Sequence, residues 1–533
     1  MANTSIWGNG QLLAFSGIDG TTSYKSGLCL RTLGGRTAFE VKLPDKAVLE
    51  LDPAVPSACD LASDWFVLEC ASGTVRGVLA DAWHLLIEGH VEVTGAGEKL
   101  QILKNGNRTL LAVADFCKPE LLECDIDAVL SARRWWADAA VERLGVADRP
   151  AAVKAIRQLK GQVYSAEGNF KQRWTTPDRW PHRGCWLWDS AFHAIGARHI
   201  DPSLARDAIL SMFDGQQPDG MIPIRVNPDS GASAIYTQPP TLVLASWAAM
   251  QSMPDPVWLR PLLPRMKAYL EWDRQNRDGG NGLPCWAIES NPGCRSGESG
   301  LDNSTRFDEA TRMEAVDFSS FMALEWELLG RLYRHMGDPA AAAVCAENHQ
   351  QLCDLIRRRL WSAEKNFFLD YDLENNRFCP VSAVTGFLPL ICGAATEEQA
   401  QMLAEHACDP ESFGTTVPLP SVARNDSTYR PDMWCGPVWV NMAWLAVMGF
   451  ERYGMHELAN EIRGRMVAEI EHWHGKLGTM FEFFDADGEI PPDELYRKGR
   501  LAPEISPYHQ CFHDYGWTAT LYLDFVLSGE LLL

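Results

Sequence analysis

The chain has 533 residues, of which 46% are hydrophobic and 22% are charged, and its 70 acidic residues outnumber its 48 basic ones. This length exceeds what one hydrophobic core usually spans, so two domains, or one large helical toroid with an appendage, are expected. The formal net charge of −22 disfavours nucleic acid as a partner, because phosphate binding requires a basic surface. No apolar run approaches the roughly 20 residues of a membrane helix, so no membrane partner is expected.

The cysteines and the N-terminus both favour the cytoplasm. The fifteen cysteines are odd in number and include no Cys-x-x-Cys pair, which predicts reduced thiols packed in the core. The first residues, Met1 to Gly8, have neither the basic nor the apolar character of a secretory signal. We therefore expect a cytoplasmic protein.

Residues 1–125 have the pattern of an antiparallel β-sandwich domain. Short runs alternate between apolar and polar residues, and Gly, Pro, Asn or Asp interrupts them every ten or so residues. The runs are 11–16, 37–43, 47–51, 65–70, 84–93 and 109–114.

A period of about 3.6 begins near residue 126 and predicts linker helices over 126–160. From 161 to 533, amphipathic segments alternate with long loops, without βαβ alternation, which favours a mainly α catalytic domain of the (α/α)6-barrel type. The helices expected there are 203–213, 240–251, 256–275, 314–336, 339–360, 397–407, 437–453, 456–473 and 515–527.

The run 295–308 combines carboxylates and arginines in a Gly/Ser-rich, non-periodic stretch between helices, which is typical of an active-site loop. Hydrolysis of a glycosidic bond needs one carboxylic acid to protonate the leaving oxygen and a second carboxylate to act on water or on carbon. Asp302 in this loop and Glu482, between Phe481 and Phe483, lie 180 residues apart, as expected of two walls of a toroid. An acid among aromatic side chains can have its pKa raised by desolvation, which suits proton transfer near neutral pH.

Other interpretations of these carboxylates stay open at this point. Glu482 could be a solvent-facing glutamate in a hairpin whose phenylalanines form the core. Asp189 precedes Ser190 where a helix is expected to start, so it could be an N-cap rather than a sugar ligand. Glu298, Asp308 and Glu309 are alternative acids, and spacing alone does not rank them.

The aromatic content is unusual, with 20 tryptophans against 12 tyrosines. Indole faces suit the C–H faces of sugar rings, although helical proteins also use tryptophan for packing. Several of these tryptophans cluster with acidic or polar residues, as in Trp186-Leu-Trp188-Asp189 and Asp432-Met-Trp434. The clusters favour a small carbohydrate as the partner.

Five segments resemble the successive motifs of glycoside hydrolase family 63, to which the trehalases of family 37 are related. The match spans residues 160 to 530. The segments are Trp188-Asp-Ser-Ala-Phe192, Glu298-Ser-Gly-Leu-Asp-Asn-Ser-Thr-Arg-Phe-Asp308, Gly436-Pro-Val-Trp-Val-Asn-Met-Ala-Trp444, Phe481-Glu-Phe-Phe-Asp485 and Tyr515-Gly-Trp-Thr-Ala519.

The resemblance implies an (α/α)6 barrel and hydrolysis with inversion, with Asp302 as general acid and Glu482 as general base. It also implies that Trp188 and Asp189 line the pocket of the released sugar. We expect the following residues to contact substrate: Trp188, Asp189, Phe192, Tyr236, Gln238, Trp286, Arg306, Trp434, Gly436, Trp439 and Trp517.

The family includes α-glucosidases and hydrolases of mannosylglycerate and glucosylglycerate, so we expect an exo-acting α-glycosidase on a small α-glucoside or α-mannoside. A glycerate aglycone would need an arginine, for which Arg183, Arg295 and Arg306 are candidates. A disaccharide would use aromatic platforms. Trehalose is disfavoured, because the segment Cys185-Trp-Leu-Trp-Asp-Ser190 is shorter than the trehalase motif. Thr305 and Cys435 also depart from the hydrolase pattern.

Other chemistries find less support in the sequence. The thirteen histidines show no metal-ligand spacing, and phosphate-loop, nucleophile-elbow and dinucleotide motifs are absent, so neither a metal nor a cofactor is expected. Two alternatives outside hydrolysis remain. A sugar epimerase on the same toroid would use His509 and His513 as acid and base. A non-catalytic sugar-binding protein would have no need of both Asp302 and Glu482.

Overall fold

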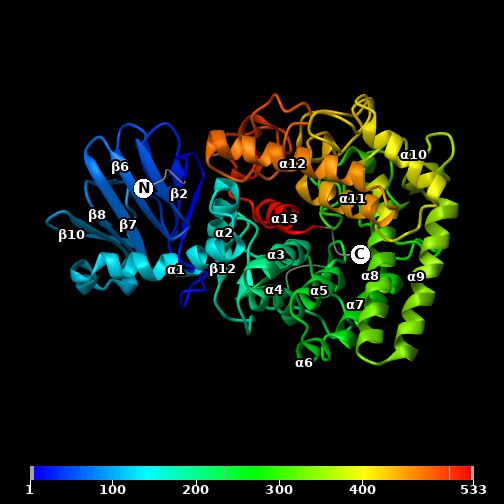
Figure 1. The fold of residues 1–533 in the computed structure, drawn as a ribbon, viewed down its shortest axis with the longest axis horizontal. Coiled ribbons are helices and arrows are strands. Elements are labelled where there is room, and N and C mark those ends of the chain that lie inside the picture. The colour runs from blue at the N-terminus through cyan, green and yellow to red at the C-terminus, as the bar shows by residue number, and fades with distance from the viewer. Residues whose placement is uncertain (1–4, 233–234, 503, 530–533) are drawn as a thin grey trace.

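The computed structural model describes residues 5–232, 235–502 and 504–529, and places two antiparallel sheets beside a larger helical part (Figure 1). The first sheet has the order β1-β2-β3-β4-β9 and the second the order β10-β11-β8-β7-β6-β5. Their bounds are β1 Leu12–Ala14, β2 Cys29–Leu33, β3 Thr37–Leu43, β4 Ala47–Asp52, β5 Ala58–Leu61, β6 Trp65–Cys70, β7 Gly73–Asp81, β8 His84–Glu88, β9 Glu92–Thr94, β10 Leu100–Asn105 and β11 Arg108–Val113.

Apolar and polar residues alternate along the strands up to residue 113, so that one of each two successive side chains points into a core that both sheets share. Leu30, Phe39 and Leu49 from the first sheet are buried with Phe66 and Leu85 from the second. The rings of Phe39 and Phe66 lie 4.9 Å apart between the sheets. The antiparallel sheets expected for this region are therefore present.

Two helices connect the sheets to the rest of the chain, as expected. In α1 (Ile126–Leu144), Asp125 caps the N-terminus by accepting from the backbone N–H groups of Asp127 and Ala128. Gly145 ends α1 in the left-handed conformation at φ 66°. The next helix, α2 (Pro150–Gln162), is buried along almost its whole length and lies between the sheets and the helical part (Figure 1).

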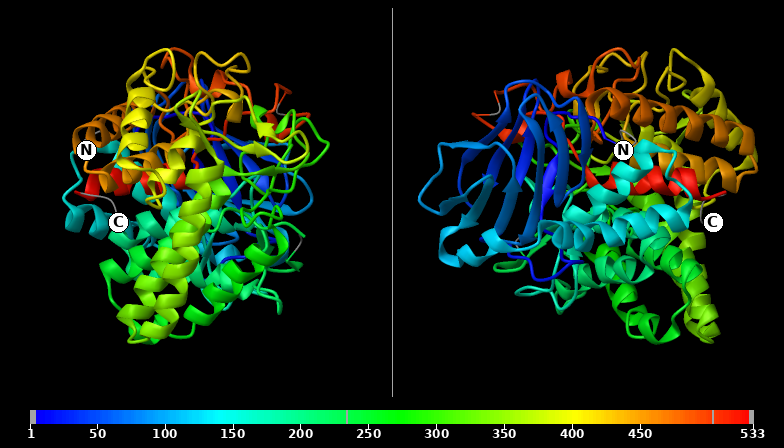
Figure 2. Two further views of the ribbon diagram at one scale, coloured as in Figure 1. Left: turned by 90° about the vertical axis from the view of Figure 1, so that its right-hand side faces the viewer. Right: turned by 60° about the vertical axis from the view of Figure 1, so that its left-hand side comes forward.

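The helical part contains the remaining helices and several two- or three-residue strands in its loops. The helices are α3 Leu187–Ile200, α4 Pro202–Asp214, α5 Leu242–Ser252, α6 Pro256–Leu259, α7 Leu263–Asn276, α8 Val316–His335, α9 Pro339–Arg359, α10 Glu397–Cys408, α11 Val440–Arg452, α12 His456–Leu477 and α13 Gly516–Leu527. The short strands are β12 Val163–Tyr164, β13 Trp174–Thr175, β14 Cys185–Trp186, β15 Arg225–Asn227, β16 Gly231–Ala232, β17 Met313–Glu314, β18 Trp361–Ser362, β19 Phe367–Phe368, β20 Tyr371–Asp372 and β21 Arg377–Phe378. Helix α13 is buried from Gly516 to Phe525 and runs through the middle of this part, as Figure 2 shows in red.

Two expected helices differ from the structure. The segment 256–275 is divided into α6 and α7, because Pro261 interrupts the first helix and Pro264 starts the second. The helix expected from residue 437 begins only at Val440. There Val438 and Phe484 exchange backbone hydrogen bonds of 2.8 and 3.0 Å, so this stretch is extended and joins the loop that contains Glu482.

All fifteen cysteines lie in the described part of the chain, and none of them forms a disulfide, as the sequence predicts. Among the described residues, no helix is long and apolar enough to cross a membrane.

Candidate active site

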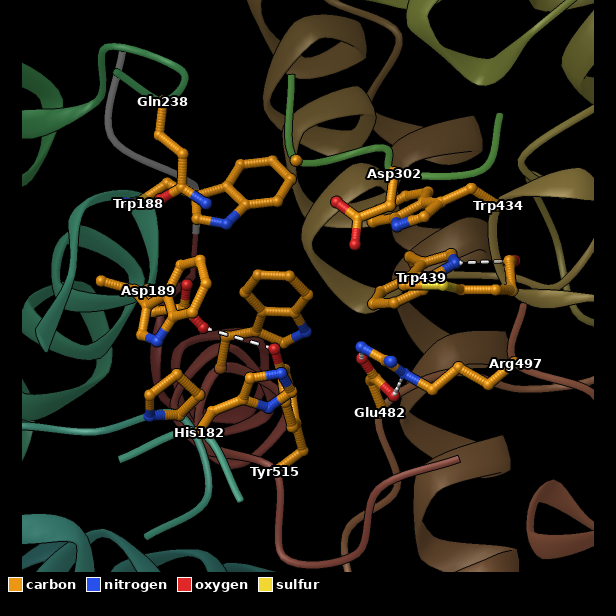
Figure 3. Close-up of a pocket in the computed structure, with 15 residues that line it drawn as sticks. His182, Trp188, Asp189, Gln238, Asp302, Trp434, Trp439, Glu482, Arg497 and Tyr515 are labelled. Atoms are coloured by element: carbon orange, nitrogen blue, oxygen red, sulfur yellow. Dashed lines mark hydrogen bonds and ion pairs between the residues drawn. The ribbon is translucent and has the colours of Figure 1, made fainter. Parts of the chain in front are cut away.

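A cavity opens in the helical part, at the N-terminal ends of α3, α11 and α13. Figure 3 shows Trp188 and Asp189 on one side of it, and Asp302, Trp439 and Glu482 on the other. The lining residues come from loops and from the first turns of helices, which lie far apart in the sequence. They are Pro177, His182, Trp186, Trp188, Asp189, Gln238, Gly300, Asp302, Met433, Trp434, Trp439, Glu482, Arg497, Tyr515 and Trp517.

Asp189 lies in the first turn of α3 and is buried, with 3% of its surface exposed. The N-cap of α3 is Trp186, so the capping role considered for Asp189 is wrong. The Tyr515 hydroxyl donates to Asp189 Oδ1 at 3.4 Å. Burial raises the pKa of Asp189 well above its usual value, an effect that nearby carboxylates reinforce. The carboxyl group of Asp189 lines the cavity, where it can bond to sugar hydroxyls.

Glu482 is 1% exposed, so it is not the solvent-facing hairpin residue that the sequence also allowed. Its backbone N–H donates to Phe512 O at 3.0 Å, which ties its segment to the strand-like stretch before Tyr515. The Arg497 guanidinium binds both carboxylate oxygens, with Nε to Oε2 at 2.9 Å and Nη2 to Oε1 at 3.1 Å. Burial raises the pKa of Glu482, and the charge of Arg497 opposes that rise.

Asp302 is more exposed, at 22% of its side chain, and pairs with Lys498 Nζ at 2.6 Å. Its loop is fixed from behind, because Arg295 N donates to Asp302 O at 2.7 Å. Asp432 joins this loop to the loop of Lys498. Its carboxylate accepts from Asn303 Nδ2 at 3.2 Å and from the backbone N–H groups of Lys498 and Gly499 at 2.7 and 3.0 Å.

Indole rings form much of the remaining surface. Trp434 and Trp439 stack with ring centroids 3.7 Å apart and planes 4° apart, and Trp188 meets Trp517 edge to face at 5.1 Å. The indole N–H groups of Trp186, Trp434 and Trp517 are buried and have no protein partner among the described residues. Buried donors are normally satisfied, so these three suit acceptors on a bound polyol.

The cavity brings together eight of the predicted site residues and leaves five outside. Inside are Asp302, Glu482, Trp188, Asp189, Gln238, Trp434, Trp439 and Trp517. Outside are Phe192, Tyr236, Trp286, Arg306 and Gly436.

The five outside residues have structural partners instead. Phe192 packs behind Trp188, with ring centroids 5.9 Å apart. Trp286 Nε1 donates to Asp317 Oδ1 at 2.8 Å, and the buried Arg306 is paired with the same aspartate. Tyr236 is half-buried and its carbonyl accepts from Ile224 N, while Gly436 is closely packed: a Cβ there would lie 2.4 Å from Arg430 O.

The alternative acids do not line the cavity either. Glu298 is buried and fully engaged: Arg277 binds both of its oxygens, and the backbone N–H groups of Thr237 and Ala287 donate to it at 3.1 and 2.9 Å. Asp308 and Glu309 have 52% and 60% of their side chains exposed.

The histidines of the epimerase alternative also lie outside the cavity. His509 bonds to Ser506 Oγ and His513 to Asn9 O. Two arginines proposed for a glycerate carboxylate are occupied by backbone carbonyls, Arg183 by that of Tyr24 and Arg295 by those of Glu289 and Phe307.

The sequence argument missed the cations. Arg497 and Lys498 are adjacent in the chain and reach Glu482 and Asp302 respectively. The basic run Arg497-Lys498-Gly-Arg500 in a chain with a net charge of −22 is the signal that could have found them. His182 and Tyr515 were also missed. Among the described residues, no group of three His, Cys, Asp or Glu could hold a metal ion.

Comparison with known proteins identifies the family. Residues 182–518, more than half of the chain, match the model of the mannosylglycerate hydrolase MGH1-like glycoside hydrolase domain. The chain belongs to this family. It is a glycosidase and a member of glycoside hydrolase family 63, as the resemblance implied.

The relatives agree with this assignment. A mannosylglycerate hydrolase of Thermus thermophilus is 28% identical over 384 residues, which are 57% of this chain and 90% of the relative. A crystal structure of a family 63 mannosylglycerate hydrolase from the same species, in complex with glucose, has 25% identity and a TM-score of 0.58. It covers 71% of this chain and 100% of that one. A bacterial glucoamylase complexed with acarbose, 10% identical, aligns with a TM-score of 0.60 over 98% of this chain and 96% of its own, a likeness of fold alone.

Proposed function

We propose that this glycosidase is exo-acting and inverts the anomeric centre of a small α-glucoside or α-mannoside, with Glu482 as general base and Asp302 as general acid. The observation that carries the proposal is that two carboxylates from separate loops enter one tryptophan-lined cavity, each with its own cation. We further propose that residues 161–533 form an (α/α)6 barrel, preceded by a β-sandwich domain at 1–125 and linker helices at 126–160.

The base is Glu482 in this proposal. A buried carboxylate tends to take up a proton, which would prevent it from activating water. The bidentate Arg497 stabilises the ionised form by about 1.5–3 kcal/mol for each charged hydrogen bond, an order-of-magnitude value. The carboxylate can therefore be ionised without contact with bulk water and can accept a proton from a water molecule positioned between it and the sugar.

The acid is Asp302, whose partial exposure places it towards the cavity mouth, where a leaving group departs. It must carry a proton at the moment of cleavage, so its contact with Lys498 has to loosen as substrate enters. The sugar then lies against Trp188 and Asp189, where an indole face and a carboxyl group match ring C–H bonds and hydroxyls. The aglycone extends towards Asp302.

The aglycone that this site fits best is a small carboxylate such as glycerate. Lys498 places a partly exposed cation beside Asp302, and once its contact with Asp302 loosens this ammonium group can interact with a carboxylate on the aglycone. The names of the relatives point the same way, since several are mannosylglycerate hydrolases and one solved structure contains Tris and D-glycerate.

A proton NMR time course tests the proposal. The panel contains mannosylglycerate, glucosylglycerate, kojibiose, nigerose, maltose and trehalose, and both substrate loss and the first anomer released are followed. We expect one of the two glycerate glycosides to be consumed fastest, with the β-sugar released first. Release of the α-anomer would refute inversion, and consumption of a disaccharide alone would refute the glycerate aglycone.

A further inference from the structure

The two N-terminal sheets lie outside the part of the chain that matches the family, which begins at residue 182. They nevertheless touch the loops that line the cavity. Arg31, in β2, makes part of this contact, because its guanidinium donates to the carbonyls of Asp178, Trp180 and His513.

Arg31 is buried, since only 7% of its surface is exposed. Its Nη1 donates to Gly10 O at 2.8 Å and to His513 O at 2.9 Å. Its Nη2 donates to Trp180 O at 2.7 Å and to Asp178 O. These acceptors are all backbone carbonyls, and in the described part of the chain no carboxylate lies within ion-pair distance of Arg31. A buried cation without a bonded anion is costly, which indicates that its hydrogen bonds serve to fix the backbone.

The carbonyls of Asp178 and Trp180 belong to the loop on the sugar side of the cavity. The side chain of Asp178 accepts from His182 N at 2.9 Å and contacts His182 Nδ1 at 3.2 Å, and His182 lines the cavity. Pro177, which also lines the cavity, accepts from Gly516 N at 2.6 Å. Arg31 therefore holds the 177–182 loop at the point where it enters the site.

The carbonyl of His513 leads to the catalytic side. His513 pairs with Phe481 in an isolated antiparallel bridge, so it lies opposite the residue that precedes Glu482. It is followed by Asp514, whose Oδ2 accepts from Leu12 N of β1 at 2.6 Å and from Lys154 of α2 at 2.8 Å. Tyr515, which contacts Asp189, comes next in the chain. The first sheet is therefore hydrogen-bonded to His513 and Asp514, and His513 pairs with the residue before Glu482.

We propose that Arg31 is a positioning residue of the active site and that the N-terminal sheets are a working part of it. One guanidinium, supplied from outside the matched region, fixes the spacing between the loop of His182 and the segment that pairs with Glu482. The sugar binds on one side of this spacing, and the water molecule from which Glu482 takes a proton attacks from the other. This inference rests on the proposed roles of Asp189 and Glu482.

The test compares Arg31→Met with Arg108→Met in the full-length protein. Arg108 serves as the control because it also lies in the sheets and donates to two backbone carbonyls, those of Leu122 and Cys124 at 3.0 and 2.9 Å. It pairs in addition with Glu88 Oε2 at 3.2 Å, and neither residue lines the cavity. For Arg31→Met we expect kcat to fall by about 10²-fold with KM changed only a few-fold, the scale known for misplacement of reacting groups by about 1 Å. For Arg108→Met we expect Tm to fall and kcat to stay within about twofold, because it touches no cavity loop.

Two substrates separate this inference from the proposed aglycone. One is the natural glycoside found by NMR, and the other is the α-glycosyl fluoride of the same sugar series, which needs the base but has no aglycone to recognise. Loss of turnover on both is expected for Arg31→Met. If the wild-type enzyme cleaves only the fluoride, the glycerate proposal is wrong. The rates of the Arg31 and Arg108 variants on the fluoride still test the role of Arg31.

A conservative variant protects the test against simple unfolding. Arg31→Lys retains one cation that can donate to fewer carbonyls, so we expect kcat between those of wild type and Arg31→Met, with a Tm near that of Arg108→Met. The inference is overturned if either Arg31 variant shows wild-type kcat on the fluoride, or if loss of kcat follows loss of Tm equally in the Arg31 and Arg108 variants.

Discussion

The cavity contains two pairs of carboxylate and cation that differ in their surroundings. Glu482 and Arg497 are almost completely buried, at 1% and 5% side-chain exposure, whereas Asp302 and Lys498 are 22% and 19% exposed. The buried pair has bidentate geometry and the exposed pair a single contact. A buried, bidentate pair suits a group that is ionised before substrate arrives, and an exposed single contact suits a group that must gain and lose a proton with each turnover.

The largest expected effect is at the buried carboxylate. Glu482→Gln removes the only proposed base, so kcat should fall by about 10²–10⁴-fold, the usual contribution of a general base. The loss should be the same on the natural glycoside and on the α-glycosyl fluoride, because both require activated water. Steady-state rates on the two substrates measure this, and a Glu482→Gln enzyme that still cleaves the fluoride normally would remove Glu482 from the base role.

Asp302→Asn should distinguish the role of Asp302 from that of Glu482. On the natural glycoside we expect a loss of about 10²–10⁴-fold, because the leaving oxygen is no longer protonated. On the fluoride, whose leaving group needs no proton, turnover should stay within about tenfold of wild type. Equal losses on both substrates would mean that Asp302 is not the acid. Circular dichroism of the variant serves as the control for folding.

Removal of Arg497 tests whether this cation keeps the buried Glu482 ionised. Burial already raises the pKa of Glu482, and Arg497 opposes the rise, so Arg497→Met should raise that pKa further. The base must be ionised to act, so the acidic limb of the kcat/KM profile should move to higher pH and activity should be lost first at low pH. An unchanged limb would show that Arg497 does not control the ionisation of Glu482.

The smallest expected effect is at the exposed cation. Exposed ion pairs contribute about 0–1 kcal/mol, so Lys498→Met should change Tm by no more than a degree or two in a chain of this size. With a glycerate glycoside we expect KM to rise by about tenfold, and with a neutral disaccharide or the fluoride we expect little change. A KM increase of the same size on neutral substrates would argue against recognition of a carboxylate by Lys498.

Local patterns in the sequence predicted the sheets and most helices because burial of one face imposes a period of two or 3.6 residues. They also made Asp302 and Glu482 candidates, but the resemblance to family 63 selected these two from the other acids, and both line the cavity. The site predictions that fall outside the cavity differ in the direction in which the side chain points. Trp286 and Arg306 lie in the expected loops but point to Asp317, and no local pattern reveals which way a loop side chain faces.

Partners from distant segments were equally hidden. Arg497 meets Glu482 across fifteen residues of irregular chain, and Arg31 meets His513 across 482 residues. Such contacts depend on how the β-sheets and the helical part come together. Only the spatial arrangement shows that an arginine in the second strand contacts His513, which pairs with Phe481.

Asp432 gives the catalytic loops a common anchor. Because one carboxylate holds both Asn303 and the backbone of Lys498, the acid and its counter-charge cannot drift apart independently: a shift of either loop carries the other with it. Replacing the 495–500 loop to alter aglycone preference would therefore also move Asp302. A redesign of this enzyme would have to exchange the loops of Asp302 and Lys498 together.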